Sequence, residues 1–136
     1  MYMAEKAQDL FMGLIVENAF TSMSDLFDHH YWFSKYINWV LEIEWDNLAI
    51  AKKLTLPVLY IAGKTDQVVP YSHSVKLHEE TKNASFKDLY IVTSKSTHTN
   101  LFHVDGDFYL AKLQFFMQEC FEKYTRRNLE KSKNEL

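Results

Sequence analysis

Cysteine, proline and glycine are all scarce in this chain of 136 residues, which contains one cysteine, two prolines and three glycines. Because Cys120 is the only cysteine, a disulfide within the chain and a C-x-x-C metal pair are both excluded. No Gly- or Pro-rich stretch marks a flexible linker, and no internal repeat is present. The sequence therefore predicts one domain with a continuous core, a conclusion that its length and its 47% hydrophobic residues support.

An excess of positive charge and a long apolar run are also missing. Fifteen basic and eighteen acidic residues give a net charge of 15 − 18 = −3. The chain as a whole therefore lacks the excess of positive charge that is typical of proteins that bind nucleic acid. No apolar stretch approaches the roughly 18 residues that a membrane-spanning helix needs. The first ten residues also lack the basic start and apolar centre of a signal peptide.

Short apolar runs alternate with longer helical patterns along the chain. We expect strands at about Met12–Glu17, Val58–Ala62 and Leu89–Thr93. We expect helices before the first strand, over about 23–43, from Asp46 as N-cap to near Lys53, from Pro70 or Ser72 to about Lys82, and from about Asp107 onward. This order predicts an α/β fold of about three parallel strands with helices on both faces.

The last expected helix carries a wide apolar stripe that is suited to packing on a sheet. Cys120 lies on this stripe, so we expect it to be a small buried hydrophobic residue. Residues 126–136 are expected to form a charged C-terminal tail. It ends in KNEL, which differs from the endoplasmic-reticulum retrieval signal KDEL only at Asn134.

Two side chains that can act as acid and base follow strands of the predicted sheet. Asp66 and His98 each come a few residues after a strand, and ligands bind outside the carboxyl ends of such strands. If these strands are adjacent, the Asp66 carboxylate can accept the Nδ1 proton of His98 and leave Nε2 free as a base. Three alternatives remain open: Asp66 as a turn former, His98 as a polar loop residue, and His103 as the base.

Three segments together resemble the C-terminal half of an α/β-hydrolase. "PVLYIAGKTDQVVP" and "STHTNLF" are similar to the loops that carry the acid and the histidine of a Ser-His-Asp triad. "YMAEKAQDLFMGLIVENAFTSM" resembles the region after the nucleophile in the bud-emergence (Bem)-like subgroup, which is related to serine aminopeptidases. The resemblance implies a partial α/β-hydrolase domain over 1–125, with a cap-like helical segment at about 23–53.

Carried onto this chain, the resemblance makes Asp66 the triad acid and His98 the triad base. Thr97 stands where the family often has glycine, and Thr99 separates the histidine from Asn100. No glycine has a serine two residues away, so the G-x-S-x-G nucleophile motif is absent. We therefore expect the C-terminal portion of a serine hydrolase for esters, thioesters or amides, inactive alone. The alternative is a non-catalytic interaction or scaffold module.

The resemblance also places a substrate pocket near the cap-like segment, and we expect Trp32, Trp39 and Tyr71 to line it. We expect the "ENAFTS" stretch to end a strand, with Thr21 or Ser22 then capping a helix. No cofactor and no metal are expected. The expected partner in the full-length protein is a small acyl, ester or peptide substrate.

Two further expectations concern assembly. The first strand, at 12–17, lacks the neighbour that the family's sheet gives it, so we expect an open edge through which two copies can form a homodimer. Members of the subgroup often carry an N-terminal membrane anchor, which implies a membrane-associated parent protein.

Overall fold

The structure is a computed structural model that describes residues 1–30, 45–93 and 95–134. In this part of the chain, three parallel strands form one sheet in the order β1-β2-β3. The strands are Leu14–Glu17 (β1), Val58–Gly63 (β2) and Lys87–Val92 (β3). The register pairs Glu17 with Ile61 and Gly63 with Val92, so all three strands end at the same rim.

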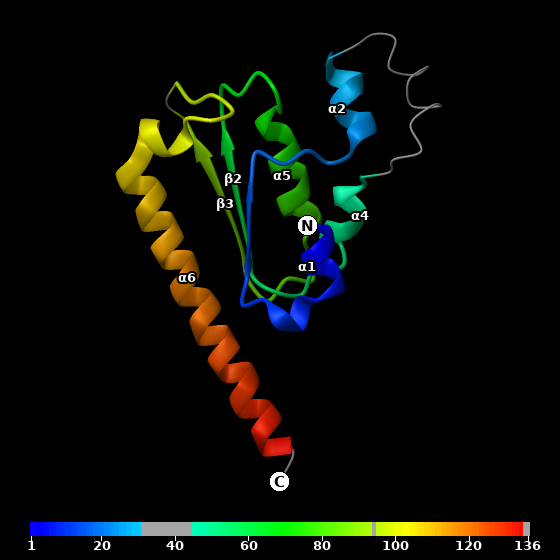
Figure 1. Cartoon of the computed structure of the whole chain (residues 1–136), viewed down its shortest axis with the longest axis vertical. Helices are drawn as coiled ribbons and strands as arrows, with labels where there is room; N and C mark the ends of the chain where they lie inside the picture. Colours follow the sequence, from blue (N-terminus) through cyan, green and yellow to red (C-terminus); the bar gives the residue numbers. More distant parts are fainter. Residues whose placement is uncertain (31–44, 94, 135–136) are drawn as a thin grey trace.

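Helices cover both faces of this sheet (Figure 1). They are Tyr2–Lys6 (α1), Met23–His30 (α2), Asn47–Ala51 (α4), Tyr71–Glu80 (α5) and Leu101–Asn134 (α6), and a short 3-10 helix spans Gln8–Leu10. In Figure 1, α6 lies against one face, while α1, α4 and α5 lie on the other. The expected α/β fold of three parallel strands between helices is therefore confirmed.

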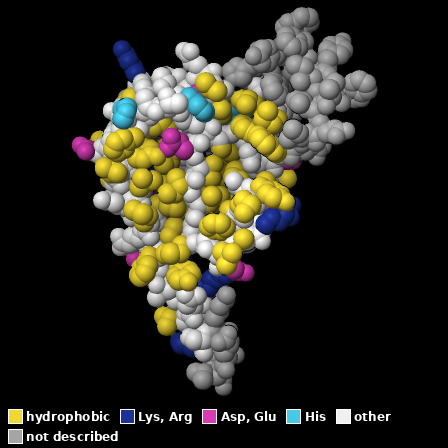
Figure 2. Space-filling view, viewed as in Figure 1, with side chains coloured by type: hydrophobic (Ala, Val, Ile, Leu, Met, Phe, Trp, Pro, Cys, Tyr) yellow, Lys and Arg dark blue, Asp and Glu magenta, His cyan; other side chains and the backbone are white. Residues whose placement is uncertain are grey.

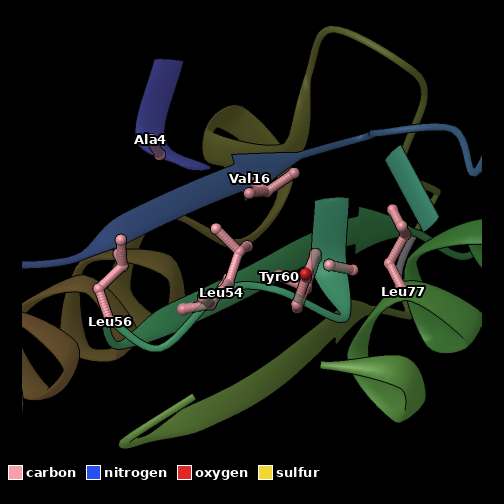
Figure 3. Close-up of a cluster of buried hydrophobic side chains, with 8 residues drawn as sticks. Ala4, Val16, Leu54, Leu56, Tyr60 and Leu77 are labelled. Carbon is pink, nitrogen blue, oxygen red and sulfur yellow. The ribbon is translucent and has the colours of Figure 1, made fainter. Parts of the chain in front are cut away.

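The central strand β2 organises two hydrophobic cores because its side chains alternate between the faces of the sheet. Val58 and Tyr60 contribute to the core beneath α1, α4 and α5, together with Leu77 of α5 (Figure 3). Leu59 and Ile61 point the other way, into the core beneath α6. Every residue of β2 is buried, which explains its unbroken apolar sequence.

The strand bounds differ by a few residues from those expected. β1 starts at Leu14 rather than at residue 12, because Met12 is 42% exposed and the first ladder bond runs from Leu14 N to Pro57 O. β3 starts at Lys87 rather than Leu89, since the ladder already begins at the bond from Val58 N to Phe86 O. The expected Asp46 cap is confirmed: its carboxylate accepts the amide of Ala49 at 2.9 Å.

The last helix is longer at both ends than the sequence pattern predicts. It begins at Leu101 rather than Asp107, and it breaks its regular dihedral angles at Asp105, where φ is −142° and ψ is 40°. Leu101 is only 1% exposed, so tertiary burial extends the element to a place where the apolar pattern does not start. Toward the C-terminus, α6 continues to Asn134 through the residues expected to be a tail, most of which are good helix formers.

Across the residues that the structure describes, no helix has both the length and the hydrophobicity to cross a membrane.

Candidate active site

The loops that leave β2 and β3 lie side by side at the rim where the strands end. The β2 loop begins at Gly63, and the β3 loop leads from Val92 into α6. The Thr65 hydroxyl in the first loop donates to the Ser96 carbonyl in the second at 2.6 Å. The two loops that carry Asp66 and His98 are therefore joined directly.

Asp66 is held by the backbone of its own loop. The amides of Val68 and Val69 donate to Oδ1 at 2.8 and 3.1 Å, forming a local turn. The side chain is fully buried, so its second oxygen, Oδ2, also needs a partner. Because the backbone occupies Oδ1, the carboxylate presents Oδ2 to the neighbouring loop.

His98 provides that partner. Its Nδ1 lies 2.8 Å from Asp66 Oδ2. A carboxylate accepts hydrogen bonds, so in the neutral imidazole this contact places the proton on Nδ1 and leaves Nε2 as the acceptor. The His98 side chain is 37% exposed, whereas that of Asp66 is 0% exposed. This arrangement suits an oriented general base with a buried acid behind it.

The other histidines whose side chains are described lie in different surroundings. His103, the alternative base, is exposed on α6 and packs against the ring of Phe102. His73 lies 2.8 Å from the Thr21 hydroxyl, and His78 packs edge-on against Tyr60. Burial lowers the pKa of His78, and the nearby Lys87 ammonium adds to this effect.

The loop around His98 is restrained at both ends. The Ser96 hydroxyl donates to the Val92 carbonyl at 3.0 Å, and the Thr97 amide donates to Asn100 Oδ1 at 2.5 Å. A β-carbon added to Gly63 would lie 3.0 Å from Ser96 Oγ and 2.9 Å from a methyl group of Leu101. Glycine thus allows the β2 backbone to approach the histidine loop closely.

Asn18, the first residue after β1, is a site-supporting residue that the sequence did not single out. Its Nδ2 donates to the His98 carbonyl at 2.7 Å, and its Oδ1 accepts the Gly63 amide at 3.2 Å. Its partners are 45 and 80 residues away, so no local pattern could identify them. An asparagine directly after an expected strand was the available signal.

The rest of the "ENAFTS" stretch behaves as expected for a strand end followed by a capped helix. Ser22 Oγ accepts the amide of Asp25 at 3.0 Å, which confirms the expected cap of α2. Thr21 is buried, and its hydroxyl donates to Asp25 Oδ2 at 2.6 Å. This segment thus ends β1 and caps the start of α2.

Of the three expected pocket residues, only Tyr71 lies in the described part of the chain. Tyr71 is the first residue of α5, directly after the Asp66 loop, and is 38% exposed. Trp32 and Trp39 lie outside the described residues. The substrate pocket stays a prediction.

A separate groove of about 670 Å³ lies between β1 and α6, away from the Asp66–His98 pair. It is lined mainly by apolar side chains and by a glycine: Met12, Gly13, Ile15, Phe116, Met117, Gln118, Cys120 and Phe121. Among the described residues, no group of three or more His, Cys, Asp or Glu side chains is placed to hold a metal ion.

A parallel sheet between helices, with an aspartate and a histidine in contact across its carboxyl-terminal rim, is consistent with the α/β-hydrolase class. Residues 1–124 match the model of the prolyl oligopeptidase family. The chain belongs to this family, and the expected resemblance to α/β-hydrolases related to serine peptidases is confirmed.

Three comparisons illustrate this relationship. The chain is 26% identical over 128 residues to the α/β-hydrolase domain-containing protein WAV2 of Arabidopsis thaliana, covering 85% of this chain and 42% of WAV2. A Pyrococcus furiosus esterase superposes with a TM-score of 0.64 at 14% identity, over 86% of this chain and 48% of the esterase. A Pyrococcus horikoshii acylaminoacyl peptidase does so with a TM-score of 0.53 at 25% identity, over 70% and 17%. The chain thus spans less than half the length of each of these proteins.

Proposed function

We propose that Asp66 and His98 are the acid and the base of a serine hydrolase that cleaves esters, thioesters or amides. The observation that carries the proposal is the 2.8 Å contact between His98 Nδ1 and Asp66 Oδ2, made by residues 32 positions apart. Membership of the prolyl oligopeptidase family supports the same chemistry.

The two residues have separate tasks in this proposal. Asp66 fixes the ring orientation and tautomer of His98 and stabilises the imidazolium that forms during the reaction. His98 Nε2 accepts the proton of a serine hydroxyl as that oxygen attacks the acyl carbon, and it then gives the proton to the leaving group. The burial of Asp66 favours this assignment of roles, because a carboxylate that is removed from water needs a hydrogen-bonded partner.

The nucleophile is proposed to come from outside these 136 residues. The chain contains no G-x-S-x-G motif, and its three glycines stand in other contexts. Removing a triad nucleophile removes covalent catalysis, so the chain alone is proposed to be inactive. A non-catalytic interaction or scaffold module is the alternative, and the experiment below separates the two.

Tyr71 is proposed to line the acyl side of the substrate pocket. It is partly exposed and starts α5 immediately after the loop that carries Asp66. Trp32 and Trp39 are proposed to complete this pocket. Two of the similar proteins, an esterase and an acylaminoacyl peptidase, are named for the cleavage of acyl compounds, and the substrate of this chain is proposed from that class.

A homodimer through β1 is proposed as well. β1 pairs with β2 on one side, and in the described part of the chain its other side has no strand. Ile15 is 44% exposed on this strand, and the apolar groove against α6 lies beside it. An open strand edge next to an apolar surface is a site for pairing with a second copy.

The catalytic proposal is tested with a polypeptide that joins this chain to a G-x-S-x-G segment from its own gene. We expect it to hydrolyse an activated ester, and we expect Asp66→Asn to lower kcat about 10⁴-fold because the histidine tautomer is lost. Asp46→Asn is the matched control, since asparagine caps α4 as well as aspartate does. We expect the 136-residue chain alone to show no turnover that depends on His98.

Two results would overturn the proposal. One is ester hydrolysis by the 136-residue chain that His98→Ala abolishes, which would place a nucleophile within it. The other is equal activity of Asp66→Asn and Asp46→Asn in the joined polypeptide. A folded joined polypeptide without any hydrolase activity would favour the scaffold module.

A further inference from the structure

Asn18 has an unusual backbone conformation at the rim of the sheet. Its φ is 46°, and it is the only non-glycine residue with a positive φ in the part of the chain that the structure describes. Asparagine tolerates this left-handed region better than most residues do. The side chain is buried, with 7% exposure, so its amide needs hydrogen-bond partners within the protein.

Asn18 finds such partners on both neighbouring segments. Its backbone amide donates to the Ile61 carbonyl at 2.9 Å, which ends the pairing of β1 with β2. Its Oδ1 accepts the Gly63 amide at 3.2 Å, and its Nδ2 donates to the His98 carbonyl at 2.7 Å. The reverse amide orientation would set donor against donor and acceptor against acceptor, so the partners determine the orientation.

These bonds connect the backbones of the two catalytic loops. Gly63 begins the loop of Asp66, and its carbonyl accepts the Asp66 amide at 3.2 Å. The other restraints on the histidine loop act at Ser96 and Asn100, on either side of His98. Among the described residues, Asn18 is the one whose side chain is seen to bond the backbone of His98 itself.

We propose that Asn18 is a positioning residue: one buried amide ties the backbone of His98 to the start of the Asp66 loop and keeps Nδ1 facing the carboxylate. This inference rests on the proposed function of the Asp66–His98 pair. Asn18 contacts no reacting atom, so its effect is on the tautomer and orientation of the imidazole. An aliphatic residue at this position can neither donate nor accept, and a hydroxyl carries its donor and its acceptors on one oxygen instead of on two separate atoms.

The test uses the 136-residue chain with ¹⁵N-labelled histidine. The ¹⁵N chemical shifts of the imidazole report which nitrogen of His98 carries the proton. The rate at which that proton exchanges with solvent reports how strongly it is hydrogen-bonded. Asn18→Asp keeps an acceptor for Gly63 but replaces the donor to His98 with a charged acceptor. Asn18→Gly removes both bonds and suits the positive φ, so it keeps the test available if Asn18→Asp does not fold.

Asn47→Ala is the matched control. Asn47 Nδ2 donates to the Phe20 carbonyl at 3.0 Å, an amide-to-carbonyl bond of the same kind that ends on the β1–α2 connection, where Asn18 lies, and not on His98. We expect both Asn18 variants to raise the exchange rate of the Nδ1 proton about fivefold, the factor that the loss of one net hydrogen bond allows. We expect Asn47→Ala to leave this rate unchanged, and melting curves to confirm that each variant is folded.

The outcomes separate this inference from the proposed function. If His98 in the unchanged chain does not carry its proton on Nδ1, the proposed Asp66–His98 pair is wrong. If it does, and the Asn18 variants exchange this proton at the rate of Asn47→Ala, the positioning role is overturned. Loss of thermal stability in the Asn18 variants without faster exchange would also overturn it.

Discussion

Tyr90 and Tyr109 each donate their hydroxyl to a carboxylate on a different element. Tyr90 of β3 bonds Asp105 at the break in α6, and Tyr109 of α6 bonds Glu17 of β1 at 2.5 Å. Burial and then the neighbouring carboxylate raise the pKa of each tyrosine to about 12. These hydroxyls connect α6 to both edge strands of the described sheet.

The raised pKa values predict how stability depends on alkaline pH. In the unfolded chain a tyrosine titrates near pH 10. The contribution of each tyrosine–carboxylate pair to the free energy of unfolding is therefore complete below that pH and is lost as pH rises through about 12. We expect the double variant Tyr90→Phe, Tyr109→Phe to lose less unfolding free energy than the unchanged chain between about pH 10 and about pH 12. Urea unfolding across this range measures the difference.

Tyr2→Phe is the control for this prediction because Tyr2 is 62% exposed and bonds no carboxylate among the described residues. Its stability curve should follow that of the unchanged chain. A double variant whose alkaline slope equals that of the unchanged chain would show that the two pairs do not couple folding to pH.

At this scale the sequence predicted the contact between Asp66 and His98, because each follows an expected strand and neighbouring parallel strands bring their ends together. It did not predict Asn18, Thr65 or the tyrosine–carboxylate pairs. Their partners are distant in sequence, and a single asparagine or threonine in a loop has many ordinary explanations. Contacts of this kind depend on strand register, which becomes known only from the structure.

At the scale of elements, Gly63 and Gly106 stand in opposite environments. At Gly63 a β-carbon would meet Ser96 and Leu101, both of which are buried. At Gly106, inside α6, the nearest atom would be 3.9 Å away, which is an ordinary contact. Substitution by alanine at Gly63 therefore reports the effect of steric crowding on stability, and the same substitution at Gly106 reports the effect of helix propensity.

We expect Gly63→Ala to destabilise the protein by roughly 1–3 kcal/mol, because neither buried neighbour can move freely. We expect Gly106→Ala to stabilise it by up to about 1 kcal/mol, since alanine is the better helix former. Chemical denaturation followed by circular dichroism measures both values. Equal stability of Gly63→Ala and the unchanged chain would contradict the close packing of β2 against the histidine loop.

The elements themselves were predicted better than their ends. An unbroken apolar run identified β2, and apolar periodicity identified the main part of α6. The segment from Leu101 to Asp105 was missed, because its helical turn depends on Leu101 packing under the rim. Local pattern thus predicted where elements lie, and tertiary contacts determined where they begin.

At the scale of the whole molecule, the apolar stripe of α6 is only partly covered. Phe116 and Cys120 are buried, whereas Met117 and Phe121 are 55% and 62% exposed. Figure 2 shows hydrophobic side chains gathered over the face that carries the free side of β1. The stripe was predicted to pack on a sheet, but the described sheet ends at β1, so half of the stripe faces outward.

This surface predicts self-association of the 136-residue chain. We expect light scattering to show a dimer fraction that rises with protein concentration, and we expect Ile15→Lys to shift the chain toward monomer by placing a charge on the open edge. Val68→Lys is the control, because Val68 is similarly exposed at 52% but lies in the Asp66 loop. A monodisperse monomer at high concentration would contradict the proposed dimer.

The pairing of Asp66 with His98 is the central claim, and proton NMR of the 136-residue chain tests it most directly. We expect a low-field resonance from a hydrogen-bonded imidazole Nδ1 proton in the unchanged chain, because the two groups lie 2.8 Å apart. This resonance should disappear in His98→Gln and in Asp66→Asn, and it should persist in Asp46→Asn. Its absence from the unchanged chain, or its survival in folded Asp66→Asn, would contradict the account.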